Sequence, residues 1–546
     1  MANAFKKVID RQMWVQVAPS PNIHAAGQGI ASDLRNDISR NPFIYQFCSA
    51  TILNRFNIIT KGWHFFGSPA VSAFAAGAGA VFAPTHALSG SIGAGCSTTK
   101  IVTTTAFTTA VGVNMLANRG GSGDYGFKVR IIGNSAGGSG KVEERWIIGN
   151  TGGTTPTLLL DVALTFTPAN GDTYEILSGR LFMLGSGALA AASWRSLEVA
   201  SNNLASLTNT NLPATVGTDF SSIALDEQYV PYNHIPGEGF IRGAAQYDGT
   251  SKYCLTATNS AAGTLTGQIT GGDAGVLANE YRNFQIRVVE DTAIPTAVNQ
   301  RRLIASHTAL AGGPVGPVYT LGSNWAVTPS TTAKYVIEYP NQILLWSTGN
   351  AVTYTYNYGP ATLNNGTTSI NAGAWSNAYY GNRGGNMGAG CTSFASFGIQ
   401  PDTEKNARHS FIYSFRGGAV STLDMLDIAG GTTGAWSNNI VYDGAVTLTT
   451  GTCGKYCPYD NEGKFGYMNI YVASVSTGAG ISQIFRFDVK NRVLSPFTPT
   501  DWLQTGTAAV GDRIATYVAI DGSDKYGMVL LMSHLSNITQ ELIVQI

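Results

Sequence analysis

The sequence predicts an all-β protein built from repeated units, and three observations lead to this prediction. Glycine contributes 65 of the 546 residues, and only 12% of the residues are charged. Globular proteins usually carry about 25% charged residues, so glycine and small polar side chains must cover much of this surface. Such a composition favours short strands and tight turns over helices. The third observation is that short segments recur along the chain.

Two segments occur twice. Gly-Ala-Trp-Ser-Asn stands at residues 373–377 and again at 434–438. Phe-Ile-Tyr-x-Phe stands at residues 43–47 and 411–415, each time upstream of a tryptophan. Alternating apolar and polar side chains mark the second segment as a half-buried strand. Four of the tryptophans follow one another at intervals of 50, 61 and 66 residues, a spacing that predicts one four-stranded unit per repeat.

The clearest repeat resembles a blade of a kelch-type β-propeller. The strand that begins at Phe411 is followed by Gly417 and Gly418, then by a strand that ends in Asp427, and then by Trp436. This resemblance implies a propeller of about seven blades. The residues expected to carry the structural repeat are Phe43, Tyr45, Trp63, Trp194, Trp325, Trp375, Phe411, Tyr413, Gly417, Gly418, Trp436 and Trp502.

The spacing of the repeated segments divides the chain into three parts. Residues 1–69 are expected to hold an N-terminal segment and the first blade. Residues 70–180 interrupt the rhythm and predict an inserted small β-sandwich, and residues 181–546 predict the remaining blades. The C-terminal segment is strand-like, and we expect it to close the ring by pairing with an early strand near Phe43, which would remove exposed edges.

Charge and cysteine content bear on partners and location. The 33 basic and 33 acidic residues cancel, so specific nucleic-acid binding is not expected. The six cysteines are too dilute for a disulfide framework, although Cys453 and Cys457 could bridge if the chain between them folds back. Charged residues occupy the place of a signal peptide, and the uncharged run at 70–83 is shorter than the ~20 residues of a membrane span. We expect no membrane anchor.

No local motif predicts catalysis, a cofactor or a metal ion. Residues 121–126 match a dinucleotide-binding glycine pattern, but a strand follows them, which favours a hairpin loop. The seven histidines lack metal-binding spacing, and the acidic loops at 460–463 and 521–524 are better interpreted as turns than as Ca²⁺ sites. Glycosylation sequons at Asn365 and Asn537 would matter only in a secretory pathway. We therefore expect no catalytic, cofactor-binding or metal-binding residues.

The chain also resembles virion structural proteins of tailed bacteriophages. The similarity lies in the phrases at residues 154–158 and 166–172 and in those at 211–218 and 225–231. It implies a non-enzymatic component of the tail, neck, collar or nozzle that is made in the bacterial host cytoplasm and incorporated into the virion. Such a protein forms a homo-oligomeric ring and contacts other virion proteins. Low charge suits the cores of such permanent interfaces.

Two alternatives stay open. A receptor- or glycan-binding propeller, acting as an adhesin or capsid decoration, would use some of the 24 tyrosines and 9 tryptophans as stacking platforms on one face. A propeller glycosidase resembling the sialidases would bring arginines and carboxylates together in a central channel. The chain lacks the Ser-x-Asp-x-Gly-x-x-Trp turns that such enzymes often carry, and its charged residues are few. The non-enzymatic interpretation is therefore preferred.

Overall fold

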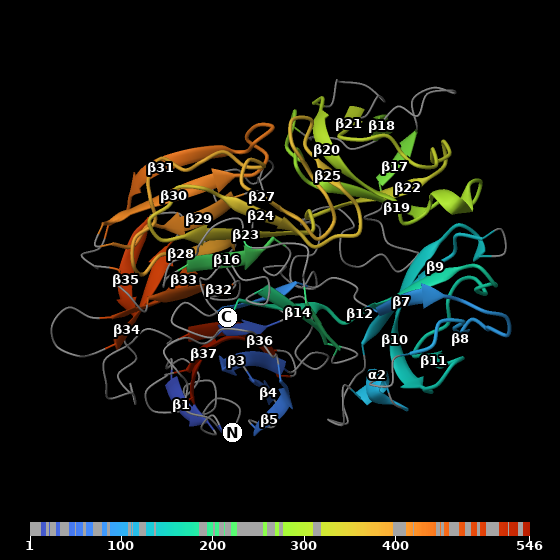
Figure 1. Ribbon diagram of the computed structural model, residues 1–546, viewed down its shortest axis with the longest axis horizontal. Coiled ribbons are helices and arrows are strands. Elements are labelled where there is room, and N and C mark those ends of the chain that lie inside the picture. Colours follow the sequence, from blue (N-terminus) through green and yellow to red (C-terminus); the bar gives the residue numbers. More distant parts are fainter. Residues whose placement is uncertain are drawn as a thin grey trace.

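The protein is almost entirely β-structured in the part of the chain that the computed structural model describes. This part comprises residues 13–17, 21, 29–32, 43–49, 51–57, 62–68, 79–83, 88–107, 111, 113–118, 127–135, 138–184, 194–199, 203–206, 212, 220–225, 255–258, 268–271, 277–309, 318–396, 411–418, 420–443, 448, 452–457, 469–475, 482–488, 492–497, 513–521, 524–532 and 539–545. It contains a single short α-helix, α2 (Met115–Asn118), and many strands (Figure 1). The prediction of an all-β protein is confirmed.

The described strands form six four-stranded antiparallel sheets, besides two insertions. In order of pairing from the first strand to the fourth, sheet 1 contains β2 (Gly29–Ser32), β3 (Phe43–Ser49), β4 (Ile52–Asn57) and β5 (Gly62–Gly67). Sheet 2 contains β6 (Gly79–Ala83), β13 (Arg180–Leu184), β14 (Trp194–Glu198) and β15 (Asn203–Ser206), and sheet 3 contains β16 (Phe220–Ala224), β23 (Gln342–Ser347), β24 (Tyr354–Asn357) and β27 (Trp375–Ser376). Sheet 4 contains β28 (Thr392–Ser396), β29 (Phe411–Phe415), β30 (Thr422–Asp427) and β31 (Ala435–Val441). Sheet 5 contains β32 (Cys453–Cys457), β33 (Asn469–Val475), β34 (Ser482–Asp488) and β35 (Val493–Phe497), and sheet 6 contains β36 (Arg513–Asp521), β37 (Asp524–Met532), β38 (Thr539–Gln545) and β1 (Met13–Val17).

The first strands of these sheets surround a common centre. Each one contacts the first strand of the next sheet, in the order β2, β6, β16, β28, β32 and β36, and β36 contacts β2 again. We call these six strands the central ring. Gly29 allows β2 and β6 to approach closely, because a Cβ atom added there would lie only 2.3 Å from the backbone nitrogen of Ala80. The arrangement resembles a β-propeller, but the described strands make six such sheets, so the prediction of about seven blades is not confirmed.

The two ends of the chain meet in sheet 6. Strand β1 pairs antiparallel with β38, with Met13 opposite Ile543 and Val17 opposite Thr539. Pairing of an early strand with the C-terminal strand therefore occurs, but the early strand is not the one near Phe43. That residue begins β3, which pairs with β2 and β4 inside sheet 1.

A first insertion lies between the first two strands of sheet 2. Its strands are β7 (Leu88–Ser91), β8 (Lys100–Val102), β9 (Lys128–Ile132), β10 (Val142–Asn150), β11 (Thr157–Leu160) and β12 (Thr173–Leu177). They form one sheet in the order β7-β12-β9-β10-β11-β8, and a bridge between Ile92 and Thr103 links its two edges. The expected insertion at 70–180 thus contains this single curled sheet, which we call the inserted sheet, while β6 and β13 on either side of it belong to sheet 2.

A second insertion, which the sequence interpretation missed, lies between the first two strands of sheet 3. Strands β17 (Leu255–Thr258), β18 (Gln268–Gly271), β19 (Gln285–Glu290), β20 (Arg301–His307), β21 (Val318–Leu321) and β22 (Lys334–Glu338) close into a barrel. We call it the inserted barrel. The interpretation of residues 181–546 as blades throughout is therefore wrong for this region. Strands with alternating apolar residues look alike in a blade and in a barrel, and only their pairing distinguishes them.

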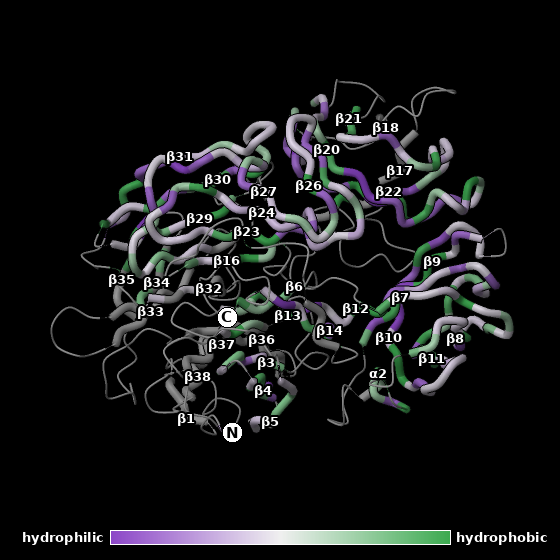
Figure 2. Tube along the Cα trace, viewed as in Figure 1, coloured by the Kyte–Doolittle hydropathy of each residue, from purple (hydrophilic) through white to green (hydrophobic). Residues whose placement is uncertain are grey.

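The two insertions lie side by side, on the right of the six sheets in Figure 1. One hydrophobic core joins Ile132 and Val142 of the inserted sheet with barrel residues such as Ile286 and with Trp346 of sheet 3. The apolar stretches of β10 and β23 stand out in Figure 2. The inserted barrel is therefore packed against both the inserted sheet and the four-stranded sheets. Among the described residues, no helix is both long and apolar enough to cross a membrane.

Candidate functional site

The predicted repeat residues occupy equivalent places in several sheets. Phe43 and Tyr45 lie in β3, and Phe411 and Tyr413 lie in β29, which are the second strands of sheets 1 and 4. The fourth strands of sheets 1, 3 and 4 carry Trp63, Trp375 and Trp436. The two repeated segments thus mark a second and a fourth strand of these four-stranded sheets.

Two of the other predicted tryptophans do not follow this rule. Trp194 lies in β14, the third strand of sheet 2. Trp325 follows β21 and packs 6.3 Å from Tyr335, ring centre to ring centre, in the inserted barrel. It therefore marks no four-stranded sheet, and the 50-residue interval between Trp325 and Trp375 does not correspond to one repeat. Trp502 lies outside the described residues.

The paired glycines make the turn that follows β29. Gly417 and Gly418 have φ angles of +66° and +65°, in the left-handed region that favours glycine. A Cβ atom on Gly417 would also lie 2.3 Å from the carbonyl oxygen of Ala389. This turn therefore needs glycine both for its backbone angle and for space.

A buried ion cluster lies in sheet 4, beneath the second Gly-Ala-Trp-Ser-Asn segment. Asp424 on β30 is fully buried and accepts hydrogen bonds from Nε and Nη2 of Arg383 at 2.9 and 2.5 Å. It also accepts two bonds of 2.9 Å from Arg416 and one of 2.9 Å from the Asn439 backbone. Arg383 belongs to the segment that leads from sheet 3 to sheet 4. The cluster therefore stabilises the packing of this connecting segment against sheet 4.

The charges of this cluster depend on one another. Burial alone would raise the pKa of Asp424, but hydrogen bonds from Arg416 and Arg383 outweigh it and hold the pKa below its usual value. The guanidinium of Arg383 lies 5.4 Å from the ring centre of Trp436, and the indole nitrogen of Trp436 donates to the Gly381 carbonyl at 2.8 Å. All these groups are satisfied within the protein, which identifies the cluster as structural.

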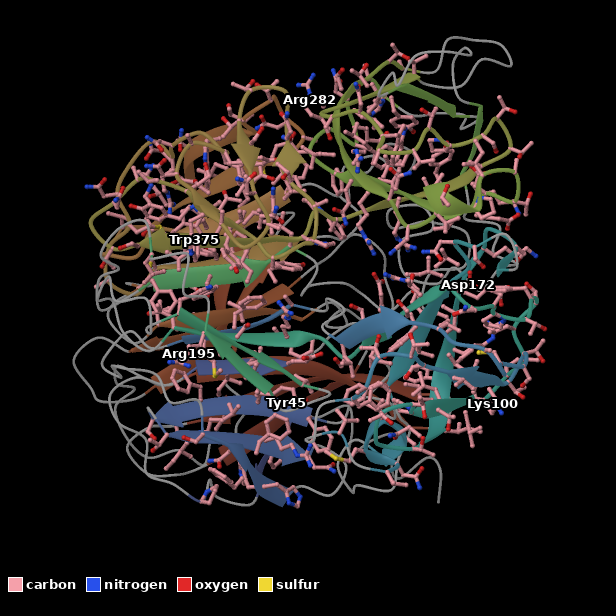
Figure 3. All side chains as sticks on the ribbon, turned by 45° about the vertical axis from the view of Figure 1, so that its right-hand side comes forward. Tyr45, Lys100, Asp172, Arg195, Arg282 and Trp375 are labelled. Carbon is pink, nitrogen blue, oxygen red and sulfur yellow. The ribbon has the colours of Figure 1, made fainter. Side chains whose placement is uncertain are left out.

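An aromatic cluster fills the space between sheets 2 and 3. The Trp194 ring lies 5.6 Å from Phe182, 5.6 Å from Tyr356 and 5.2 Å from Trp375. Desolvation by burial raises the pKa of Tyr356 to about 12. Trp375, labelled in Figure 3, is half-buried. The Phe182 ring is stacked on Trp194 and the other two rings meet Trp194 edge to face, so the main effect of the cluster is packing between the two sheets.

The central ring carries few charged residues. Strands β2, β6, β16 and β28 read Gly-Ile-Ala-Ser, Gly-Ala-Val-Phe-Ala, Phe-Ser-Ser-Ile-Ala and Thr-Ser-Phe-Ala-Ser, without Asp, Glu, Lys, Arg or His. The charged residues of the other two first strands are Lys455, Arg513 and Asp521. Four of the six strands therefore offer no acid, base or cationic group at the centre.

The two insertions are joined by a polar network. Glu175 on β12 accepts from Nη1 of Arg130 at 3.1 Å and from the Asn299 amide at 3.0 Å, and Arg301 of the barrel lies 3.8 Å away. An antiparallel bridge connects Lys141 with Glu290. Together with the shared core, these contacts make the insertions one continuous body.

The inserted barrel is also fastened to sheet 4. The Asn283 amide donates to the carbonyls of Ile428 and Gly431 at 2.6 and 3.0 Å. Nearby, Nε2 of His307 accepts from the Tyr281 backbone at 2.9 Å, and Nδ1 lies 3.0 Å from the Thr308 carbonyl. Desolvation lowers the pKa of His307 to about 4. The imidazole is accordingly a neutral, structural group.

One exposed surface has no such internal role. Ile148, Leu159 and Val162 are 61%, 45% and 58% exposed on neighbouring segments of the inserted sheet, and we call them the aliphatic patch. A register shift after Ile147 brings Gly149 opposite Leu159. A Cβ atom on Gly149 would lie 3.1 Å from the Leu159 side chain, so glycine leaves room for that side chain to lie across β10. The patch is the candidate contact surface.

The structure bears on two of the remaining sequence hypotheses. Cys453 and Cys457 are the two ends of the extended strand β32, which separates their Cα atoms by about 13 Å, beyond the reach of a disulfide. Asp521 and Asp524 face each other across a hairpin, as a turn requires. Residues 121–126 and 460–463 lie outside the described residues. Within the described residues, no group of three or more His, Cys, Asp and Glu side chains could hold a metal ion.

Comparisons with known proteins find distant similarities of structure. No protein-family profile and no curated protein matches the chain. Among solved structures, Sqt1 of Saccharomyces cerevisiae has a TM-score of 0.29 at 9% identity, with 98% of this chain and 99% of that chain covered. The NanB sialidase of Streptococcus pneumoniae has a TM-score of 0.21 at 9% identity, covering 98% and 95%. The leech intramolecular trans-sialidase has a TM-score of 0.19 at 9% identity, covering 99% and 94%. Similarity at this level identifies neither a family nor a function.

Proposed function

We propose that the protein is a non-enzymatic structural component of a tailed-bacteriophage virion, located in the tail, neck or collar. In this proposal the six sheets are the blades of a β-propeller that the pairing of β1 with β38 closes. The chain forms a homo-oligomeric ring and binds other virion proteins through its insertions. The sequence segments described above support the assignment to a phage, and the geometry of the two insertions supports the structural role.

The observation that carries the structural role is the double insertion. The inserted sheet and the inserted barrel each lie between the first and second strands of a four-stranded sheet, in the neighbouring sheets 2 and 3. The two insertions contact each other through Glu175 and through a shared hydrophobic core. Such a body keeps its shape under load, because moving one domain would break buried contacts in the other. The aliphatic patch on the inserted sheet is exposed in the single chain. This is expected of a surface that a second protein covers in an assembly.

The chemistry of the centre also supports this proposal over a glycosidase. Most glycosidases use a pair of carboxylates, and the sialidase-like alternative would bring arginines and carboxylates together in the central channel. Four strands of the central ring contain no ionisable residue, and the carboxylate of Asp424 is already occupied by two arginines.

Mass measurement in solution tests the proposal. Size-exclusion chromatography with light scattering should show a defined oligomer for the full chain, and electron microscopy should show rings. Leu159→Asp should weaken association by about tenfold or more, since a charge in an apolar contact is left unpaired. Val441→Asp is the matched control, because Val441 is 71% exposed on β31 and lies outside the patch.

Three outcomes would refute the proposal. One is a stable monomer at high concentration that binds a glycan. Another is hydrolysis of a glycoside that is lost when Asp521, the one carboxylate in the six strands of the central ring, is replaced. The third is equal association of the wild type and Leu159→Asp.

A further inference from the structure

Asn365 belongs to a glycosylation sequon that the fold buries. The sequence reads Asn365-Gly366-Thr367, the acceptor pattern Asn-x-Thr. The Asn365 side chain is fully buried, whereas Thr367 is exposed. Modification would take place at Nδ2, and this atom donates hydrogen bonds to the carbonyls of Tyr379 at 3.3 Å and Thr432 at 2.7 Å.

The oxygen atom of the Asn365 amide also takes part in hydrogen bonds. Its oxygen accepts from the backbone nitrogens of Thr367 at 2.9 Å and Thr368 at 2.7 Å, inside the turn between β25 (Leu363–Asn364) and β26 (Ser369–Ile370). The side chain therefore shapes this hairpin and fastens it to sheet 4. The Asn283 amide lies against the same sheet 4 turn, 3.4 Å from the Thr432 carbonyl.

Glycosylation and this geometry conflict chemically. A transferase joins Nδ2 of asparagine to C1 of a lipid-linked oligosaccharide, and the lipid pyrophosphate leaves with one amide proton. The product nitrogen keeps a single hydrogen, so it cannot donate to both Tyr379 and Thr432. A sugar on Nδ2 would also have to occupy a site with no exposed surface, between the hairpin and sheet 4.

We propose that Asn365 is a glycan acceptor only in the unfolded chain, and that a glycan at this position prevents the hairpin from docking onto sheet 4. N-glycosylation and the native fold then exclude each other. The proposal does not depend on the virion function, since it concerns only whether the chain can fold when Asn365 carries a glycan.

In vitro glycosylation of the full chain tests the proposal. The protein is incubated, folded or unfolded in urea and diluted, with an oligosaccharyltransferase that accepts Asn-x-Thr and with its lipid-linked oligosaccharide. Peptide mapping by mass spectrometry reads Asn365 separately from Asn537. We expect modification of Asn365 to be about a hundredfold slower or more in the folded chain, because the hairpin must first open. The glycosylated chain should then fail to regain the wild-type melting transition.

Thr367→Ala is the matched control. It removes the sequon but keeps the Asn365 amide and all four of its hydrogen bonds, because Thr367 contributes only its backbone nitrogen to them. After the same treatment this variant should carry no glycan at Asn365 and should refold as the untreated protein does. Two results would overturn the proposal: equal modification rates in the folded and unfolded chains, or a chain that carries the glycan at Asn365 and melts like the wild type.

Discussion

Replacing Asp424 with Asn should destabilise the protein by about 3–5 kcal/mol, which is the cost of removing one partner from a buried ion pair. The substitution keeps the shape of the side chain and one acceptor oxygen but removes its charge. The side chain of Arg383 is fully buried and that of Arg416 is 14% exposed, so water cannot compensate the charge of Arg383 and can solvate Arg416 only in part. If the amide oxygen keeps the bond from the Asn439 backbone nitrogen, the amide NH2 group takes the place of Oδ2 and cannot accept the bonds from Arg383, so charge and hydrogen bonds are lost together.

The pH dependence of this effect has a definite sign. Because the folded-state pKa of Asp424 lies below that of an ordinary aspartate, its contribution is present above about pH 4 and is lost as the pH falls through the folded-state pKa. The stability difference between wild type and Asp424→Asn should therefore shrink in strongly acidic solution. Equilibrium urea unfolding at several pH values measures the difference, and hydrogen exchange of β29 and β30 amides gives a local reading.

Glu290→Gln is the control for Asp424→Asn. Glu290 pairs with Lys334 at 2.9 Å, but the lysine side chain is 34% exposed, so solvent screens the pair. This substitution should cost about 1 kcal/mol or less. If Asp424→Asn costs no more than Glu290→Gln, the reasoning that burial makes the Asp424 cluster structurally important is refuted.

Three further predictions follow from single contacts. Between pH 6.5 and about 4 the imidazole of His307 is protonated in the unfolded wild-type chain but neutral in the folded one, so wild-type stability should fall by about 3 kcal/mol over that range. His307→Gln removes this group and should flatten the pH dependence of stability. Gly417→Ala should cost about 2 kcal/mol or more in urea unfolding, whereas Gly349→Ala should cost about 1, since Gly349 shares a positive φ but faces open space. Glu175→Gln should cost about 2 kcal/mol and raise hydrogen exchange in both β12 and β20, because it weakens the contact between the insertions.

Each of these predictions has a contradicting outcome. An unchanged acid slope in His307→Gln would mean that another group titrates in that range. Equal costs at Gly417 and Gly349 would mean that the contact with Ala389 relaxes freely. Faster exchange in β12 alone after Glu175→Gln would show that the two insertions open independently.

The candidate contact surface could not be found from the sequence. Leu159 sits in a run of three leucines, of which Leu158 and Leu160 are buried and Leu159 is exposed. Alternation along a strand predicts that Leu159 points away from its neighbours but not which face is covered. The exposed position of Ile148 depends on a register shift between β10 and β11, which is a property of the pairing.

The sequence by itself determined the local features of this protein. Its glycine content and alternating patterns specify short strands, Gly417 and Gly418 specify a turn, and the Phe-Ile-Tyr-x-Phe segments specify half-buried strands, because all these depend on a few neighbouring residues. Tertiary structure alone decided that Trp325 belongs to a barrel, that Cys453 and Cys457 lie at opposite ends of one strand, and that β1 rather than the strand at Phe43 meets β38. The reason is that strand pairing joins residues hundreds of positions apart, and a strand's own side chains do not state which partner it will have.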